Sequence, residues 1–182
     1  MLETRTYRPF EIDRMLDSMI LLVDTRENER TEAYKRRIEA IGLPHERVAL
    51  SYADYSCKVI DPSGDVLDMR QLFAIERKSG LSELCNNFTS ERERFGKEFQ
   101  RAEADGCRIH LIVENDNYEK LRHGNYRSKL NPQSLIASAL SWSIKYNIQL
   151  HFCRQETTGW LIAQILRYEL RHHLLYDARN TG

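Results

Sequence analysis

The feature that most constrains the fold is an uninterrupted apolar run at residues 19–23, which has the length of a β-strand. A continuous run of this kind is typical of a strand that is buried on both faces, as in a sheet with helices on either side. It ends at Asp24, and residues 28–41 then place apolar side chains on one helical stripe that stops at Gly42. The first clear elements are therefore a buried strand and a helix.

Strands and helices alternate through the rest of the chain. We expect further strands at residues 45–52, 57–60, 72–78, 107–113 and 148–153, and helices at residues 81–87, 90–104, 131–146 and 156–173. The Pro-Ser-Gly composition of residues 61–65 predicts a hairpin turn, and the basic, irregular residues 117–130 indicate a loop. This order predicts an α/β fold with a central mixed sheet flanked by helices.

Length and composition favour a single domain. The chain has 182 residues, of which 41% are hydrophobic, enough for a substantial core. We assign residues 18–176 to this domain, residues 1–17 to an N-terminal arm (extended or a short helix) that lies on it, and residues 177–182 to a frayed tail. The 27 basic and 27 acidic side chains cancel, which argues weakly against a protein that merely coats DNA.

Several classes of protein are disfavoured. No apolar run approaches the length of a membrane span, and the first residues lack the apolar core of a secretory leader. The four cysteines are widely spaced and include no Cys-x-x-Cys pair, which favours reduced thiols over disulfides or a zinc site. We therefore expect a cytoplasmic protein with no membrane partner. His110, inside an apolar strand, is expected to be a core histidine.

The strand expected at residues 72–78 ends in Glu76, Arg77 and Lys78. Side chains on a strand alternate between faces, so Glu76 and Lys78 point the same way and Arg77 points the other way. A carboxylate beside an ammonium suits phosphodiester hydrolysis, which uses an oxygen ligand for a metal and a cation near the phosphate. Taken alone, this tripeptide is better explained as the solvated end of a strand, because Glu-Arg-Lys is common on protein surfaces.

Carboxylates at other strand ends strengthen the first interpretation. Asp24 and Glu27 follow the first strand, and Asp54 follows the second. Carboxylates that converge repel one another unless a cation lies between them. Oxygen ligands without histidine or thiolate suit Mg²⁺ or Mn²⁺ rather than zinc.

These motifs resemble the nuclease domain of the XPF-type structure-specific endonucleases. That family's signature combines an Asp-x-Arg-Glu strand end, a Gly-Asp-Tyr and a Glu-Arg-Lys-Ser followed closely by an acid. The corresponding motifs of this chain begin at Asp24, Ala53 and Glu76. The resemblance runs from about residue 19 to residue 114 and is expected to reach the closing helix. It implies a restriction-endonuclease-like core of the PD-(D/E)XK kind.

The resemblance implies roles for the acidic residues and the lysine. Asp24, Asp54 and Glu76 would bind Mg²⁺ or Mn²⁺, with Glu27 supporting or completing the site. Lys78 would hold the attacking water or stabilise the charge that develops on the phosphorus group.

The resemblance also implies roles for basic residues. Arg77 would brace the active-site loop by ion pairing, with a purely structural role as the alternative. On the next helix, Arg94 or Arg92 would face the DNA backbone, together with Lys97. The loop at residues 117–130 is either a second DNA-binding patch or a solvated flap, and its basic members are Lys120, Arg122, Arg127 and Lys129.

Two positions depart from the family pattern. Ala53 stands where the family has a glycine before the second acid, and Ser82 stands where the family has an acid after the lysine. Glu83 follows directly and would serve in its place after a one-residue shift of the loop.

The sequence therefore predicts a metal-dependent DNA endonuclease that acts at branched or flap DNA in repair or recombination. We expect a stand-alone module of the kind found in bacteria or phages, which works as a homodimer. Trp142 and Trp160 are expected in the core, with a dimer surface as the second interpretation. The alternatives are a nuclease-like module that binds DNA or a partner protein without cutting, and a nuclease that acts on ordinary duplex.

Overall fold

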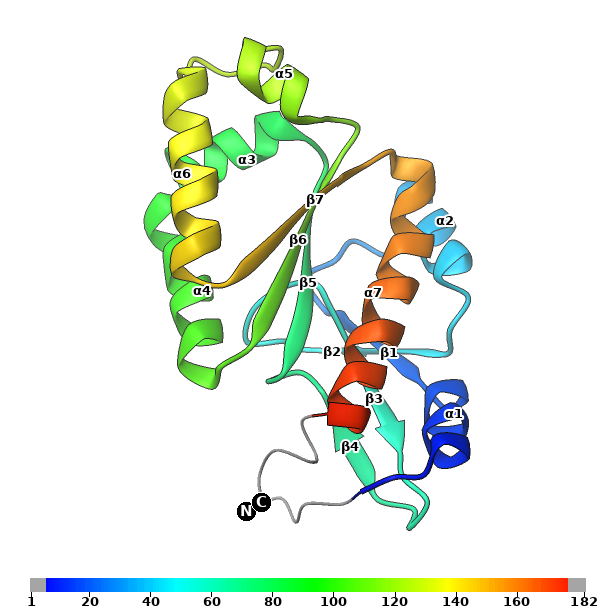
Figure 1. Ribbon diagram of the computed structural model, residues 1–182. Coiled ribbons are helices and arrows are strands. Elements are labelled where there is room, and N and C mark those ends of the chain that lie inside the picture. Colours follow the sequence, from blue (N-terminus) through cyan, green and yellow to red (C-terminus); the bar gives the residue numbers. More distant parts are fainter. Residues whose placement is uncertain (1–5, 177–182) are drawn as a thin grey trace.

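One mixed β-sheet forms the centre of the protein in the computed structural model, which describes residues 6–176 (Figure 1). The strands are β1 (Ile20–Asp24), β2 (His45–Val48), β3 (Tyr55–Ile60), β4 (Val66–Asp68), β5 (Phe73–Lys78), β6 (Arg108–Glu114) and β7 (Ile148–Cys153). Their order is β2-β1-β3-β5-β6-β7, with β4 paired to β3. β1 is parallel to β2, and β5, β6 and β7 are parallel, whereas β3 is antiparallel to its neighbours.

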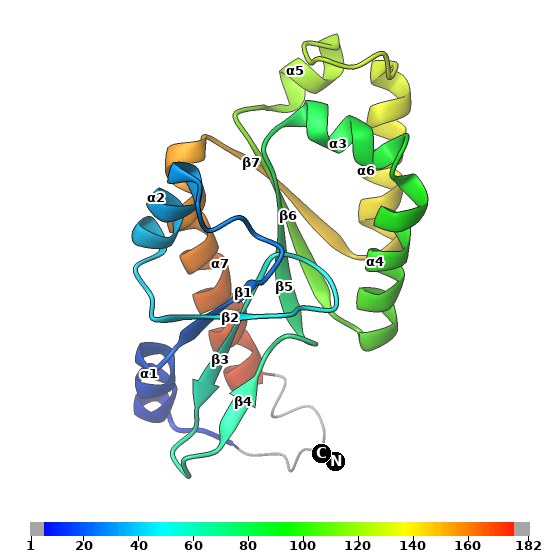
Figure 2. The same cartoon turned by 180° about the vertical axis from the view of Figure 1, so that it is seen from behind.

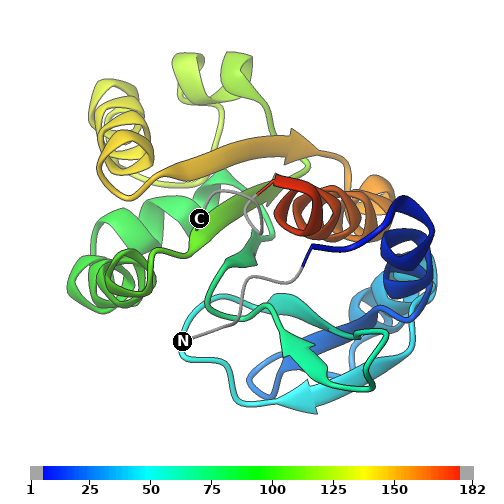
Figure 3. The ribbon, with the colours of Figure 1, turned by 60° about the horizontal axis from the view of Figure 1, so that its bottom comes forward.

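Helices cover both faces of this sheet, which confirms the predicted α/β fold. The helices are α1 (Pro9–Asp17), α2 (Glu32–Ile41), α3 (Leu81–Phe88), α4 (Arg92–Asp105), α5 (Tyr118–His123), α6 (Pro132–Lys145) and α7 (Gln155–Tyr176). α1, α2 and α7 lie on one face, and α3, α4 and α6 lie on the other (Figures 1 and 2). The view from below shows the sheet between these two layers (Figure 3).

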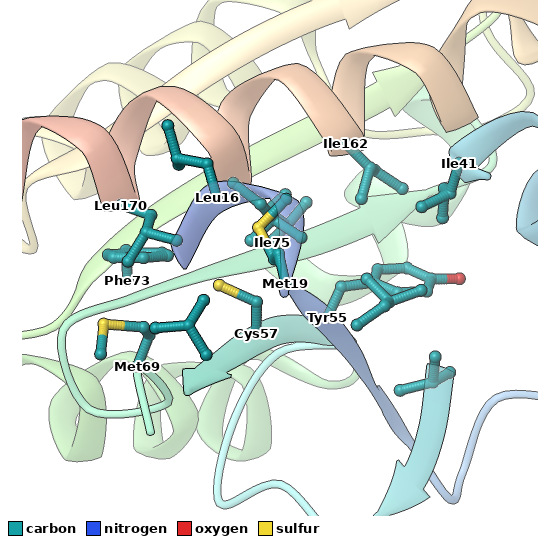
Figure 4. Packing of buried hydrophobic residues seen from close by; sticks show 14 of the residues in the cluster. Leu16, Met19, Ile41, Tyr55, Cys57, Met69, Phe73, Ile75, Ile162 and Leu170 are labelled. Atoms are coloured by element: carbon teal, nitrogen blue, oxygen red, sulfur yellow. The ribbon is translucent and has the colours of Figure 1, made fainter. Parts of the chain in front are cut away.

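The core on the α7 side joins the sheet to the closing helix. Tyr55, Cys57 and Ile75 project from β3 and β5 toward Ile162 and Leu170 of α7 (Figure 4). All five side chains are fully buried. Alternation along β3 and β5 places every second residue on this face, so the period of the strands determines which residues enter this core.

The N-terminal segment takes the second of its two predicted forms, a short helix, and this helix is built into the core. Residues 9–17 form α1, whose side chains Ile12, Met15 and Leu16 are each 1% exposed and belong to the same core. These residues share one helical stripe, and burying it against α7 and β3 ties α1 into the domain. α1 is thus part of the domain rather than an arm beside it. Residues 1–5 of the expected arm and the expected tail at 177–182 lie outside the described residues.

The core on the opposite face is aromatic. Trp142 of α6 packs among the rings of Phe88, Phe95 and Phe99, with centroid distances between 5.0 and 5.9 Å. The expected core position of Trp142 is confirmed, whereas Trp160 on α7 is 56% exposed and does not belong to the core. Its place on the outer side of the closing helix explains the difference.

Several element boundaries differ from the sequence prediction. β2 stops at Val48, and the expected loop at residues 117–130 contains the short helix α5, capped by the Asn117 side chain and ended by Gly124. α4 is preceded by Glu91 rather than by Ser90 as the capping residue. All four cysteines are unpaired thiols. None of the helices within residues 6–176 combines the length and apolar character needed to cross a bilayer.

Candidate active site

Main-chain hydrogen bonds bring three acidic segments to one place on the sheet. The Asp24 N–H donates to the Asp54 carbonyl at 2.8 Å, and the Asp54 N–H donates to the Ile75 carbonyl at 2.9 Å. The Arg77 N–H donates to Oδ2 of Asp54 at 2.8 Å. Residue 54 therefore lies between the ends of β1 and β5, and the sheet itself fixes its carboxylate beside Glu76.

Glu76 and Lys78 form a buried ion pair on the α4 side of the sheet. Their closest atoms, Oε1 and Nζ, are 2.6 Å apart, and the two residues are 5% and 7% exposed. The ammonium of Lys78 also lies 4.8 Å from the centre of the Phe95 ring. Burial would lower the pKa of Lys78, but the carboxylates of Glu76, Asp54 and Glu83 together raise this pKa. The predicted shared face of Glu76 and Lys78 is confirmed, and Lys78 is held as a cation.

The acidic side chains of Asp54 and Glu76 lie close together. Burial raises the pKa of Asp54 well above its usual value, and the nearby carboxylates of Glu76 and Glu27 raise it further. Burial also raises the pKa of Glu76, although Lys78 opposes this shift. The residue before Asp54, Ala53, has a φ of +60°, in the left-handed region that glycine adopts most easily. The backbone thus keeps the conformation that the family's glycine would favour.

Asp24, which was predicted to bind a metal, accepts hydrogen bonds through both of its carboxylate oxygens. Its Oδ1 accepts from Arg26 N and Arg26 Nε, each at 2.7 Å, and its Oδ2 accepts from Leu50 N at 2.8 Å and Arg26 Nη2 at 3.2 Å. Burial opposes the ionised form, but these hydrogen bonds lower the pKa of Asp24. Both oxygens of Asp24 are therefore engaged by N–H donors, mainly those of Arg26.

The remaining acidic residues fit a divalent cation in part. Within residues 6–176, no group of three or more His, Cys, Asp or Glu side chains is arranged to hold a metal ion, so the predicted trio is not assembled. Asp54 Oδ1 accepts no hydrogen bond from the described residues, and the contact of Glu76 with Lys78 runs through Oε1, which leaves Oε2 for another ligand. Burial raises the pKa of both carboxyls, and the charge of Glu76 raises that of Asp54 further, so a cation would stabilise the ionised forms of both. These two oxygens suit Mg²⁺ or Mn²⁺.

Arg77 points to the α2 side of the sheet, where a buried charge network begins. Its Nη1 lies 3.0 Å from Oε2 of Glu114. Glu114 also pairs with Arg37 of α2 at 3.5 Å, and Arg37 in turn lies 3.1 Å from Oε2 of Glu27. The same Glu27 oxygen accepts from the Tyr55 hydroxyl at 2.7 Å. Glu27 is therefore held by this network and reaches Asp54 only as a neighbouring charge.

Sequence reasoning missed Arg26, Arg37 and Glu114. Arg37 shares the helical stripe of Tyr34 and Ile41, so a charged residue on an otherwise apolar face was a usable signal. Glu114 ends a buried strand in the same way as the acids that were identified.

Glu83 lies at the edge of the site, whereas Ser82 serves a different purpose. Glu83 Oε2 accepts from Ser79 N at 2.8 Å and Ser79 Oγ at 2.7 Å, and its Oε1 lies 3.7 Å from Lys78 Nζ. Ser82 Oγ accepts from the Arg127 N–H at 3.0 Å and so fastens the basic loop to α3. An acid is thus present beside Lys78 one residue later than the family pattern places it.

The basic residues predicted to bind DNA on α4 are divided between two sides. Arg94 pairs with Glu98 at 3.6 Å, and the charge of Glu76 reaches it, so it borders the site. Arg92 instead lies 5.2 Å from the Trp142 ring and faces α6. Lys97 pairs with Glu93 on the exposed surface at 2.7 Å.

The four basic residues of the loop are not equivalent. Lys120 stays partly exposed but is tied to the end of β6, where its Nζ donates to the Asn115 carbonyl at 2.7 Å. Arg122 lines an apolar hollow between α5 and α6. Arg127 and Lys129 are exposed, and only the backbone of Arg127 is tied to α3.

His110 is the satisfied core histidine that its strand predicted. It is 8% exposed, its Nε2 lies 2.7 Å from Glu169 Oε1, and its Nδ1 lies 2.9 Å from His151 Nε2. Burial lowers the pKa of His151, and His110 lowers it further. This cluster lies on the α7 face, away from Glu76.

Comparison with known proteins identifies the family of this chain and its fold. A family model described as the ERCC4 domain matches residues 23–164. Similar solved structures include XPF from Aeropyrum pernix, which is 20% identical with a TM-score of 0.58 over 81% of this chain and 65% of that chain. XPF from Aeropyrum pernix in complex with DNA is also 20% identical, with a TM-score of 0.54 over 82% of this chain and 64% of that chain. This chain therefore spans just under two thirds of those chains, and the likeness shows a shared fold. No curated protein sequence matches the chain.

Proposed function

This chain belongs to the ERCC4 domain family, and from that premise we propose that it is a metal-dependent DNA endonuclease that hydrolyses phosphodiester bonds. The observation that carries the proposal is the buried Glu76–Lys78 pair, 2.6 Å apart, beside the crowded carboxylate of Asp54. Keeping a buried lysine charged next to two carboxylates costs stability through desolvation, and such arrangements are typical of functional sites.

Each residue of the proposed active site has its own role in phosphodiester hydrolysis. A bound Mg²⁺ or Mn²⁺ supplies a Lewis acid that polarises the phosphate and favours ionisation of water. Asp54 and Glu76 would hold this ion, and Lys78 would stabilise negative charge on the phosphate or orient the attacking water. Arg77 keeps the strand in register because its N–H holds Asp54 while its guanidinium holds Glu114. Arg94, at the border of the site, would contact the DNA backbone.

We assign branched or flap DNA as the substrate, in repair or recombination in the cytoplasm of a bacterial or phage-infected cell. We also propose that the protein acts as a homodimer. α6 and α7 expose Leu140, Ile144, Trp160 and Tyr168, which are between 48% and 85% exposed. Leu140 and Ile144 lie on α6, and Trp160 and Tyr168 lie on α7 on the opposite face of the sheet; large exposed apolar side chains of this kind favour association with a second copy.

A second candidate is a module that binds DNA or a partner protein without cutting. Two observations favour it: the carboxylate of Asp24 is fully engaged by Arg26 and Leu50, and Ser82 fastens a loop where the family has an acid. Retention of Asp54, Glu76 and Lys78 in one buried site favours the endonuclease.

Cleavage assays distinguish these candidates. The protein is incubated with Mg²⁺ or Mn²⁺ and labelled flap, fork, Holliday-junction and plain duplex DNA. Asp54→Ala and Lys78→Met are expected to lower the cleavage rate by at least about a hundredfold, as removal of an electrostatic catalyst does. Lys35→Met, which removes an exposed lysine of α2, is the matched control and is expected to cut normally.

Failure of the wild-type protein to cut any of these substrates would contradict the endonuclease and leave the binding module. Full activity in both Asp54→Ala and Lys78→Met would place the active site elsewhere. Cleavage of plain duplex as fast as flap DNA would contradict the proposed substrate alone.

A further inference from the structure

A polar cavity of about 340 Å³ opens on the same face of the sheet as Glu76 and Lys78. It lies between the loop that follows β2, the turn before β5 and the end of α4, three segments that run close to one another at this end of the sheet (Figure 2). The residues that give it chemical character are Ser51, Tyr52, Asp68, Gln71, Ala74 and Asp105.

The walls of this cavity are fixed by hydrogen bonds. The Tyr52 hydroxyl lies 3.0 Å from Asp105 Oδ2 and 3.2 Å from the Arg70 carbonyl. Arg101 of α4 donates through Nε and Nη2 to the Ser51 carbonyl at 3.1 and 2.9 Å. The loop is thus tied to α4, so the cavity exists without a ligand and a ligand would not have to order it.

The chemistry of the lining excludes an anion and favours a neutral polar ring. Two carboxylates face the cavity, and its one guanidinium, on Arg70, already pairs with Asp68 at 2.7 Å. The side chains of Ser51 and Gln71 make no hydrogen bond within residues 6–176, and Tyr52 and Ala74 add apolar surface. A phosphate would be repelled, whereas the donors, acceptors and flat faces of a nucleobase would be matched.

The cavity lies about one nucleotide away from the proposed reaction centre. Ala74 in its wall and Glu76 in the site are two residues apart on β5, so they share a face with a separation of about 6.6 Å. On the other side, Tyr52 is two residues from Asp54. A base adjoining a phosphate at Lys78 can therefore reach the cavity if that base is unpaired.

We propose that this cavity receives an unpaired nucleobase next to the scissile phosphate. The proposal rests on the endonuclease function and deepens it, because only DNA with single-stranded character at the cut can offer such a base. Duplex DNA would have to break a pair first, which costs a few kcal/mol. The cavity would then be the feature that makes the enzyme select branched DNA.

The test scans a flap substrate with a single abasic nucleotide at each position flanking the mapped cut. In the wild-type protein, one abasic position is expected to lower cleavage about tenfold, the scale of one lost base contact. Ser51→Trp, which fills the mouth from an exposed position, is expected to lower cleavage of the intact flap by a similar factor and to remove the sensitivity to that abasic position. Ser63→Trp, in the exposed β3–β4 turn, is the control and is expected to behave as wild type.

Equal cleavage at every abasic position, or a Ser51→Trp variant that keeps the wild-type pattern, would overturn the proposal while the endonuclease stands. A binding measurement covers the opposite case, in which the protein cuts nothing. Saturation-transfer NMR with deoxycytidine and deoxyadenosine, which carry no phosphate, is expected to detect binding to wild type and to Ser63→Trp but not to Ser51→Trp. No binding to wild type would mean that the cavity is only a water-filled hollow.

Discussion

Gly159 permits the closest approach between α2 and α7, and replacing it tests how the site depends on that packing. A Cβ at this position would lie 2.6 Å from the Ala40 Cβ and 2.7 Å from the Arg37 carbonyl oxygen. Carbon atoms in contact prefer about 3.5–4.0 Å, so Gly159→Ala requires α2 to retreat by about 1 Å. Arg37 lies on the helix that must move and holds Glu27 at 3.1 Å, so the strain reaches the acidic site.

The size of the effect follows from two opposing contributions. Overpacking of this kind costs about 1–3 kcal/mol, whereas alanine in a helix interior is about 1 kcal/mol better than glycine. Because one of the contacts is with main chain, we expect a net loss of about 1–2 kcal/mol. For a domain of this size that loss lowers the melting temperature by about 2–8 °C.

Thermal unfolding followed by circular dichroism measures this change, and Gly96→Ala is the matched control. Gly96 also lies inside a helix, but its nearest atom is the ring edge of Trp142 at 3.4 Å. There the helix preference is expected to prevail, with stability unchanged or raised by up to about 1 kcal/mol. A Gly159→Ala protein that melts at or above the wild-type temperature would refute the packing argument.

Two further predictions concern charge. The pKa of Asp54 is raised in the folded protein, so its ionisation opposes folding more strongly as the pH rises above the unfolded value of about 3.9. Without divalent ions, Asp54→Asn should therefore be more stable than wild type at pH 8 by on the order of 1 kcal/mol. In urea titrations this gain should vanish near pH 4. A stability difference that stays constant at all pH values would show that the ionisation of Asp54 is not its cause. Arg37→Met removes the positive charge that pairs with Glu114 and Glu27, and should cost about 3 kcal/mol of stability in the same assay. The control Arg36→Met, at an exposed position of the same helix, should cost almost nothing. Equal stability of the two variants would show that the ion pairs of Arg37 are not energetically important.

The sequence by itself determined the class of fold and the local geometry of Glu76, Arg77 and Lys78. Backbone alternation depends only on strand geometry, so the shared face of Glu76 and Lys78 follows from a spacing of two residues. The left-handed backbone of Ala53, in contrast, was not predicted from the sequence.

Tertiary structure decided which charges meet. Glu114 contacts Arg37 across 77 positions of the chain, and that pairing depends on how α2 packs against the sheet. Asp24 and Asp54 looked equivalent as acids at strand ends. The loop after β1 folds Arg26 back onto Asp24 and leaves Asp54 facing Glu76. Periodicity is a property of neighbouring residues and is written in the sequence, whereas the partner of a buried charge is set by the register and packing of segments distant in the chain.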